Sequence, residues 1–124
     1  MKRMKRAILI VAAKRLAKRR KAARAAMKCF HNMIDLVTQN AKGHGYCIAV
    51  HGSLLRDIDL VAVPWADKVA KPAVLHDSIF KLCRALYPRA YTHPSSEKKP
   101  HRRLAWVINL GVGGTYIDLS VIRP

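Results

Sequence analysis

The fold of this chain is decided by the stretch from His51 to Pro64, which reads HGSLLRDIDLVAVP. Within it, Ile58 to Val63 forms an apolar, partly β-branched run that ends at a proline, and this pattern predicts a strand. A similar run from Tyr46 to Val50 precedes Gly52 and Ser53. The stretch therefore predicts two strands that are joined tightly.

Two amphipathic helices are predicted on either side of these strands. From Ala26 to the stop at Gly43, apolar residues recur at helical spacing, namely Met27, Phe30, Met33, Ile34, Val37 and Ala41. A second helix begins at Pro72, because proline suits a first helical turn, and ends before Pro88. Its apolar positions also repeat at intervals of three and four, which predicts that this helix covers the sheet.

The C-terminal part of the chain predicts two more strands, 104–110 and 115–122, linked by the glycine-rich segment 111–114. The preceding segment, 89–103, is rich in proline, serine and cations and predicts a mobile, basic loop. The sequence therefore predicts an α+β fold, with a small mixed or antiparallel sheet and helices mainly on one face.

Charge divides the 124 residues into two regions. The first 28 residues carry twelve Lys and Arg and no acid, whereas the whole chain has a net charge of +17. We expect a basic arm over 1–26, helical or partly disordered, and a domain over 27–124. Since Met27 lies at the start of the predicted helix of the domain, the arm could also be an upstream extension.

The arm attracts polyanions, and composition alone leaves nucleic acid, anionic lipid and acidic proteins open as partners. We expect nucleic acid, bound through Lys14, Arg15, Lys18, Arg19, Arg20, Lys21 and Arg24. The chain has no apolar stretch that could span a bilayer. Its three cysteines are odd in number and widely spaced, which favours a reducing cytoplasm over an oxidising compartment.

The seven acidic residues of the chain are placed unevenly. Alternate side chains of a strand share a face, so Asp57 and Asp59 lie on one side while Ile58 enters the core. Asp118 has the same apolar neighbours in a later predicted strand. If the two strands are adjacent, three carboxylates converge, and Mg²⁺ or Mn²⁺ would relieve their repulsion. The alternative is a simple solvated sheet face.

These motifs resemble the nucleotidyltransferase superfamily that includes DNA polymerase beta. The resemblance spans Tyr46 to Val121 and rests on His51-Gly52-Ser53, Asp57-Ile58-Asp59-Leu60 and Tyr116-Ile117-Asp118-Leu119. It implies a minimal nucleotidyltransferase-like core in which Gly52 and Ser53 contact phosphate. It further implies that Asp57 and Asp59 bind the catalytic metals, and that Asp118 completes the site and helps to activate the acceptor hydroxyl. Residues 56–65 also look like a group of small, often phage-encoded relatives.

One departure from the family concerns the phosphate-binding loop. Only three residues separate Ser53 from Asp57, where the family usually inserts a longer segment that begins a helix, so we expect an altered phosphate cradle. Candidates to hold the triphosphate are Arg56 and the cluster of Lys98, Lys99, His101, Arg102 and Arg103. Arg56 could instead pair with a neighbouring aspartate, and the cluster could be merely solvated.

The sequence thus predicts a metal-dependent nucleotidyltransferase that moves a nucleoside monophosphate from a nucleoside triphosphate to a hydroxyl on RNA, protein or a small molecule. The alternative is a noncatalytic nucleic-acid-binding protein that keeps this fold and binds through its cationic arm. A third hypothesis is a subunit or toxin-like chain whose activity needs another protein.

Overall fold

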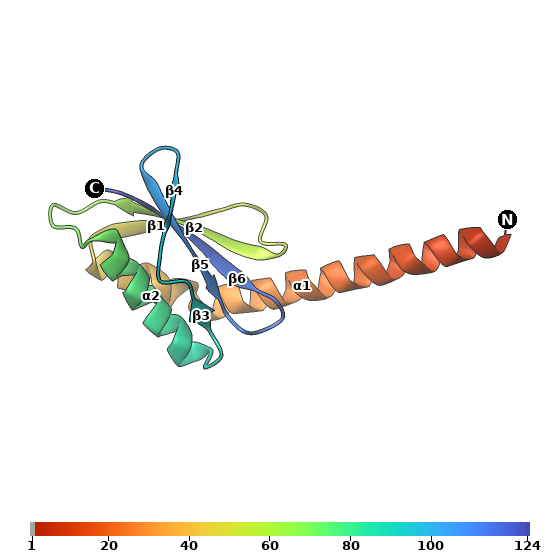
Figure 1. Cartoon of the computed structure of the whole chain (residues 1–124). Helices are drawn as coiled ribbons and strands as arrows, with labels where there is room; N and C mark the ends of the chain where they lie inside the picture. Colours follow the sequence, from red (N-terminus) through yellow and green to blue (C-terminus); the bar gives the residue numbers. More distant parts are fainter. Residues whose placement is uncertain (1) are drawn as a thin grey trace.

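The computed structural model describes residues 2–124, which fold into two helices and six strands (Figure 1). In chain order the elements are α1 (Lys2–Gly43), β1 (Tyr46–His51), β2 (Asp57–Pro64), α2 (Pro72–Leu86), β3 (Tyr91–Thr92), β4 (Glu97–Lys99), β5 (Arg103–Asn109) and β6 (Tyr116–Ile122). The α+β prediction is confirmed, as are the four main strands and the helix that begins at Pro72.

Helix α1 is one continuous element, about 63 Å long at the usual rise of 1.5 Å per residue. Its C-terminal half packs in the domain through Ala26, Cys29, Met33, Val37 and Ala41. Residues 2–21 are all exposed, and this half projects away from the domain (Figure 1). The arm, expected to be helical or partly disordered, is helical and continuous with the predicted core-facing helix, because the strong helix propensity of alanine, lysine and arginine carries α1 to Lys2.

The sheet is mixed. Its strand order is β1-β2-β6-β5-β3, and β4 pairs with the part of β5 that β3 leaves unpaired. Strands β2 and β6 are parallel, and the other pairs are antiparallel. A parallel pair needs a crossover connection, and α2 supplies the helical part of it. The topology places the two acid-bearing strands, β2 and β6, side by side in the middle of the sheet.

Both helices cover the same face of the sheet (Figure 1). Ile58 and Leu60 of β2, with Ile117 and Leu119 of β6, are buried in one core together with apolar residues of α1 and α2. The intervening residues Asp57, Asp59 and Asp118 are only partly buried. They lie on the opposite, helix-free face, as the alternation of side chains along a strand requires.

The segment 89–103 is not the loop that the sequence predicted. It contains β3 and β4, and β4 forms a hairpin with β5 through a turn at which His101 and Arg102 have φ angles of 64° and 62°. These strands are two and three residues long, and pairing with the edge of β5 stabilises them despite an unfavourable composition. The predicted glycine turn between β5 and β6 is confirmed, with positive φ at Gly111, Gly113 and Gly114.

Candidate active site

Strand register brings the three predicted aspartates together on the open face of the sheet. Asp59 of β2 is directly opposite Asp118 of β6, and Asp57 is opposite Tyr116. On the other side of β2, His51 is the partner of Asp59. Neighbouring strands lie about 4.8 Å apart, so His51, Asp59 and Asp118 form one row across three strands.

Repulsion within this row acts on Asp118. Burial raises the pKa of Asp118, and the negative charge of Asp59 raises it further. Lys99 and His51 act in the opposite direction, and the charge of Asp57 adds a smaller upward effect. Asp59 and Asp57 are therefore close enough to oppose the ionisation of Asp118, which is the condition under which a bound cation stabilises such a site.

Asp57 has one satisfied and one unsatisfied oxygen. The Tyr116 hydroxyl donates a hydrogen bond of 2.7 Å to Asp57 Oδ2. This bond to the carboxylate is the main reason that the pKa of Tyr116 is raised. Asp57 Oδ1 is buried and has no hydrogen-bond partner among residues 2–124. Since a buried carboxylate oxygen without a partner is costly, this oxygen is available as a ligand for a cation.

The loop after β1 lies directly against the acidic row. Gly52 has a φ angle of +80°, and a Cβ atom at this position would collide with the carboxylate of Asp59. The backbone conformation therefore favours glycine, and any larger residue would displace the Asp59 carboxylate. Ser53 is exposed, and its Oγ accepts a hydrogen bond of 3.4 Å from Leu55 N–H. As predicted, no helix forms between Ser53 and Asp57.

The predicted phosphate-binding cations are divided by the fold. Arg56 is exposed next to Asp57 and forms no ion pair with Asp57 or Asp59 within the described chain. Arg103 is paired with Ile122, four residues beyond Asp118 and so about 13 Å along the strand. Backbone oxygens of Pro124 and Pro100 accept hydrogen bonds from Arg102 and Arg103, respectively. These two arginines thus lie at the far end of the sheet from the acidic row.

Lys99 is the cation of the β4–β5 hairpin that acts on the aspartates. Its Nζ is 3.1 Å from Glu97 Oε1. Glu97 is paired with Ala105 of β5, and Ala105 is paired with Ser120 of β6. Measured along the strands, Glu97 is therefore two residues nearer to Asp118 than Lys99 is. This ion pair directs the ammonium group toward Asp118 and accounts for the influence of Lys99 on the pKa of that carboxyl.

The donor set fits a hard divalent cation such as Mg²⁺ or Mn²⁺. Asp59 and Asp118 are neighbours in register, and Asp57 offers an unpartnered oxygen. In the part of the chain described, however, no three His, Cys, Asp or Glu side chains are already gathered as a metal-binding group. The Tyr116 hydroxyl, on the same strand as Asp118, holds one oxygen of Asp57, Oδ2, in a hydrogen bond.

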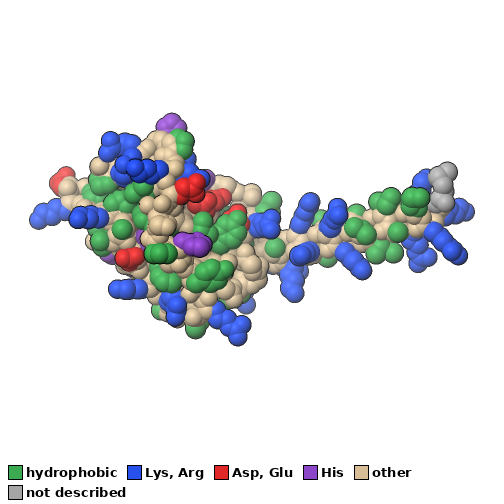
Figure 2. Space-filling view, viewed as in Figure 1, with side chains coloured by type: hydrophobic (Ala, Val, Ile, Leu, Met, Phe, Trp, Pro, Cys, Tyr) green, Lys and Arg blue, Asp and Glu red, His purple; other side chains and the backbone are tan. Residues whose placement is uncertain are grey.

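The basic arm begins beside this site. Figure 2 shows acidic side chains gathered on the domain near the root of the arm, and Lys and Arg side chains distributed along the arm. A groove of about 720 Å³ is lined by residues of the arm and by Leu55 and Arg56 of the β1–β2 loop. In residues 2–124, no helix has a segment long and apolar enough to cross a bilayer.

Sequence reasoning missed three contributions to the site. The motif Tyr116-Ile117-Asp118-Leu119 gave no role to Tyr116. Because Tyr116 lies two residues before Asp118 in a strand, its side chain is expected on the same face of the sheet as that of Asp118. His51 belongs to the motif at the end of the first predicted strand, and the structure adds that it is the cross-strand partner of Asp59. The approach of the arm to the β1–β2 loop had no signal in the sequence, because the direction of a helix relative to a sheet depends on packing.

Comparison of the chain with protein-family models, with curated proteins and with solved structures found no match.

Proposed function

We propose that this protein is a metal-dependent nucleotidyltransferase that transfers a nucleoside monophosphate from a nucleoside triphosphate to a hydroxyl acceptor. The observation that carries the proposal is the in-register pair of Asp59 and Asp118 on adjacent parallel strands, with the unpartnered Oδ1 of Asp57 on the same open face. Such a cluster is costly to fold without a ligand, and a carboxyl group whose pKa is raised by burial and by neighbouring carboxylates, as that of Asp118 is, is typical of functional sites.

Asp57, Asp59 and Asp118 would hold the divalent cation. Bound there, the metal would supply neutralisation of charge on the reacting phosphate and its leaving group. The loop at Gly52 and Ser53 would bind phosphate through its exposed backbone N–H groups and hydroxyl, because no side chain at position 52 blocks a close approach. The resemblance to the nucleotidyltransferase superfamily supports the same assignment of roles.

In the proposed reaction the acceptor oxygen forms a bond to the α-phosphorus while the bond from that phosphorus to pyrophosphate breaks. The hydroxyl proton passes to a carboxylate, and the resemblance to the superfamily implies that Asp118, which lies directly opposite Asp59, takes this role. Pyrophosphate leaves with the negative charge of the broken bond. Lys99 faces the same carboxyl and would help to keep it ionised before the reaction.

The proposal is tested by nucleotide binding in the presence and absence of metal. We expect a fluorescent nucleoside triphosphate analogue to bind wild-type protein with Mg²⁺ or Mn²⁺ and to bind weakly in EDTA. Asp57→Asn should abolish the metal-dependent part, because it removes one of the three carboxylates. Asp35→Asn removes the same charge from an exposed position on α1 and should bind as wild type does. Equal binding by all three proteins would rule out the proposed site.

The second candidate function is noncatalytic binding of nucleic acid through the arm. Two features favour it: the short loop from Ser53 to Asp57, and the groove between the arm and Arg56. This function predicts nucleic-acid binding that depends steeply on salt, is lost on deletion of residues 1–26, and is indifferent to Asp57→Asn. Metal-dependent nucleotide binding that is sensitive to Asp57 would favour the enzyme instead.

A reducing cytoplasmic setting is part of the same proposal. Cys29, Cys47 and Cys83 are all free thiols. Burial raises the pKa of Cys83 to about 12, so this thiol behaves as an apolar core residue. An unpaired set of three cysteines is typical of proteins from reducing compartments.

A further inference from the structure

The packed face of α1 continues outward onto the arm. Within the domain, Ala26, Cys29 and Met33 are buried at intervals of three and four residues. The same spacing toward the N-terminus leads through the partly buried Ala22 to Arg19 and Arg15. These two arginines therefore lie on the side of the arm that faces the domain, unlike cations on the outer side of the helix.

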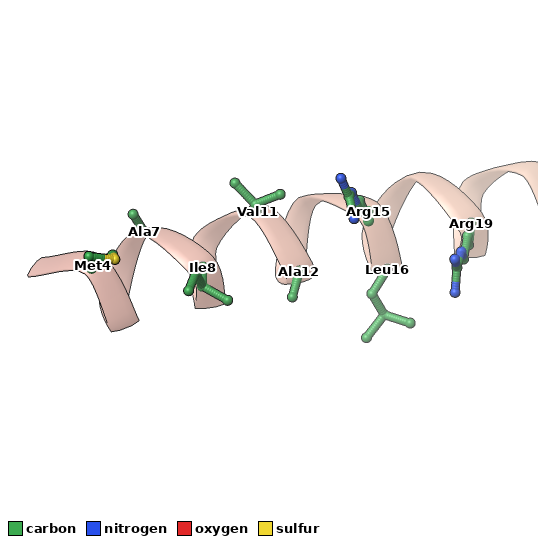
Figure 3. Close-up of a pocket in the computed structure, with 8 residues that line it drawn as sticks. All are labelled: Met4, Ala7, Ile8, Val11, Ala12, Arg15, Leu16 and Arg19. Carbon is green, nitrogen blue, oxygen red and sulfur yellow. The ribbon is translucent and has the colours of Figure 1, made fainter. Parts of the chain in front are cut away.

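Arg15 and Arg19 line one wall of the groove of about 720 Å³, and Leu55 and Arg56 of the β1–β2 loop line the other. Lys18 and Arg20 also contribute, which gives the groove five cations and no acidic residue. On the exposed arm, Arg15 and Arg19 also lie close to the mainly apolar residues that precede them along the helix (Figure 3). A groove with cations on both walls concentrates anions more strongly than a flat basic surface does.

The groove lies at the end of the sheet that carries the acidic row. Arg56 is adjacent in sequence to Asp57, the first residue of β2. On the neighbouring strand, the β5–β6 turn lies against α1 next to the groove, since a Cβ atom at Gly113 would be 2.8 Å from Ala25 Cβ. The groove therefore opens at the end of the sheet where β2 and β6 begin and where the three aspartates lie.

We infer that this groove binds the phosphodiester backbone of a single nucleic-acid strand and directs its terminal hydroxyl to the carboxylates. The inference rests on the proposed transferase function and names its acceptor class. A strand fits better than a nucleotide triphosphate alone, because the lining residues of the arm extend over about 12 Å from Arg15 to Ala23. A lipid surface fits poorly, because the cations occupy two facing walls rather than one plane.

The test is binding of a fluorescein-labelled, mixed-sequence single-stranded RNA about 12 nucleotides long, in EDTA and without nucleotide, across a salt series. With five phosphate contacts, the log of the binding constant should fall with log salt at a slope of about −3.5. The variant Arg15→Gln/Arg19→Gln/Arg56→Gln should make this slope shallower by about two units, since each lost contact removes about 0.7 from its magnitude. Circular dichroism establishes that the variant is folded.

The matched control is Arg3→Gln/Lys5→Gln/Arg6→Gln, which removes the same three charges from the distal arm, outside the groove. We expect its slope to equal that of wild type. Equal losses in the two triple variants would overturn the inference, because they would reduce RNA binding to net charge. An RNA affinity that the groove variant leaves unchanged would also overturn the inference. If inorganic tripolyphosphate then binds wild type but not the groove variant, the groove belongs to the nucleotide.

The same experiment separates this inference from the proposed function. Asp57→Asn/Asp59→Asn should bind the RNA at least as tightly as wild type in EDTA, because it removes negative charge beside the groove. If the RNA binds in the groove but is never extended in the presence of nucleotide and metal, the transferase proposal fails, while RNA binding by the groove still holds. If an acceptor is extended equally well without Arg15, Arg19 and Arg56, the inference about the groove fails, while the proposed transferase function still holds.

Discussion

Replacing Asp118 by asparagine should stabilise the protein while it removes the proposed activity. Asp118 is partly buried and directly opposite Asp59, and both features raise its pKa. Ionisation of Asp118 therefore costs folding free energy. The asparagine side chain keeps the shape of the aspartate without its charge. The Asp118→Asn variant should therefore gain the folding free energy that ionisation of Asp118 costs the wild-type chain at neutral pH.

The size of the gain follows from the separation of adjacent strands. Two unit charges about 5 Å apart repel by about 0.8 kcal/mol in bulk water and by roughly 3 kcal/mol at an effective dielectric constant of about 20. The open face of the sheet is partly hydrated, and like charges placed directly opposite in sheets typically cost about 0.2–1 kcal/mol. We therefore expect Asp118→Asn to raise the melting temperature by about 2–5 °C.

The assay is thermal unfolding followed by circular dichroism, in metal-free buffer at several pH values. Because the pKa of Asp118 is raised on folding, its ionisation destabilises the fold only as the pH rises through the folded-state pKa. The advantage of the variant should be absent near about pH 3 and complete at about pH 7. Added Mg²⁺ should stabilise wild type more than the variant, because only wild type has the complete set of carboxylates.

Asp67→Asn is the control, since Asp67 is exposed outside the acidic row. Its melting temperature should stay within about 1 °C of wild type at every pH. If Asp118→Asn melts at or below the temperature of wild type at neutral pH, or if its effect is the same at both pH extremes, repulsion between Asp59 and Asp118 is not the feature that we describe.

Three further predictions concern single side chains. Gly52→Ala should lower stability by about 1–2 kcal/mol and weaken metal binding, because the new Cβ meets the Asp59 carboxylate and the φ angle is positive; melting and Mn²⁺ titration measure both effects. Tyr116→Phe should cost about 1 kcal/mol in denaturant unfolding through loss of the bond to Asp57. Iodoacetamide should leave Cys83 unmodified at about pH 8 until the protein unfolds, because burial raises its pKa to about 12.

The main elements of the fold were predictable because their signals are local. Proline fixes the first turn of α2, apolar residues at helical spacing define its buried side, and β-branched runs between glycines and prolines define β1 and β2. The glycines at 111–114 identify the β5–β6 turn, since several of them need positive φ. Each of these signals depends only on residues that are close in sequence.

The elements that were not predictable depend on distant partners. Strands β3 and β4 contain polar or charged residues and form only because β5 offers an unpaired edge. The sequence left the arm as either helical or partly disordered, and the structure shows that helix propensity continues across the boundary that charge indicated. Neither local composition nor periodicity states which edge of a sheet is free.

The candidate site was predictable to a similar extent. Alternation along β2 and β6 gives the face of each aspartate, but only the sheet register brings Asp59 opposite Asp118. Proximity in sequence to a strand also suggested Arg102 and Arg103 as phosphate ligands, whereas the hairpin carries them about 13 Å from the acidic row. Of the predicted cluster, Lys99 is the cation that acts on Asp118. Arg56 shares a groove with the arm, which the sequence presented as a separate region.

The most direct test of the central claim is a transfer assay with each α-labelled nucleoside triphosphate, Mg²⁺ or Mn²⁺, and a pool of RNA and protein acceptors. Wild-type protein and the Asp57→Asn/Asp59→Asn variant are compared side by side. We expect labelled acceptor and released pyrophosphate with wild type and neither product with the variant. Absence of label with both proteins, or equal labelling by both, would contradict a nucleotidyltransferase site at these carboxylates.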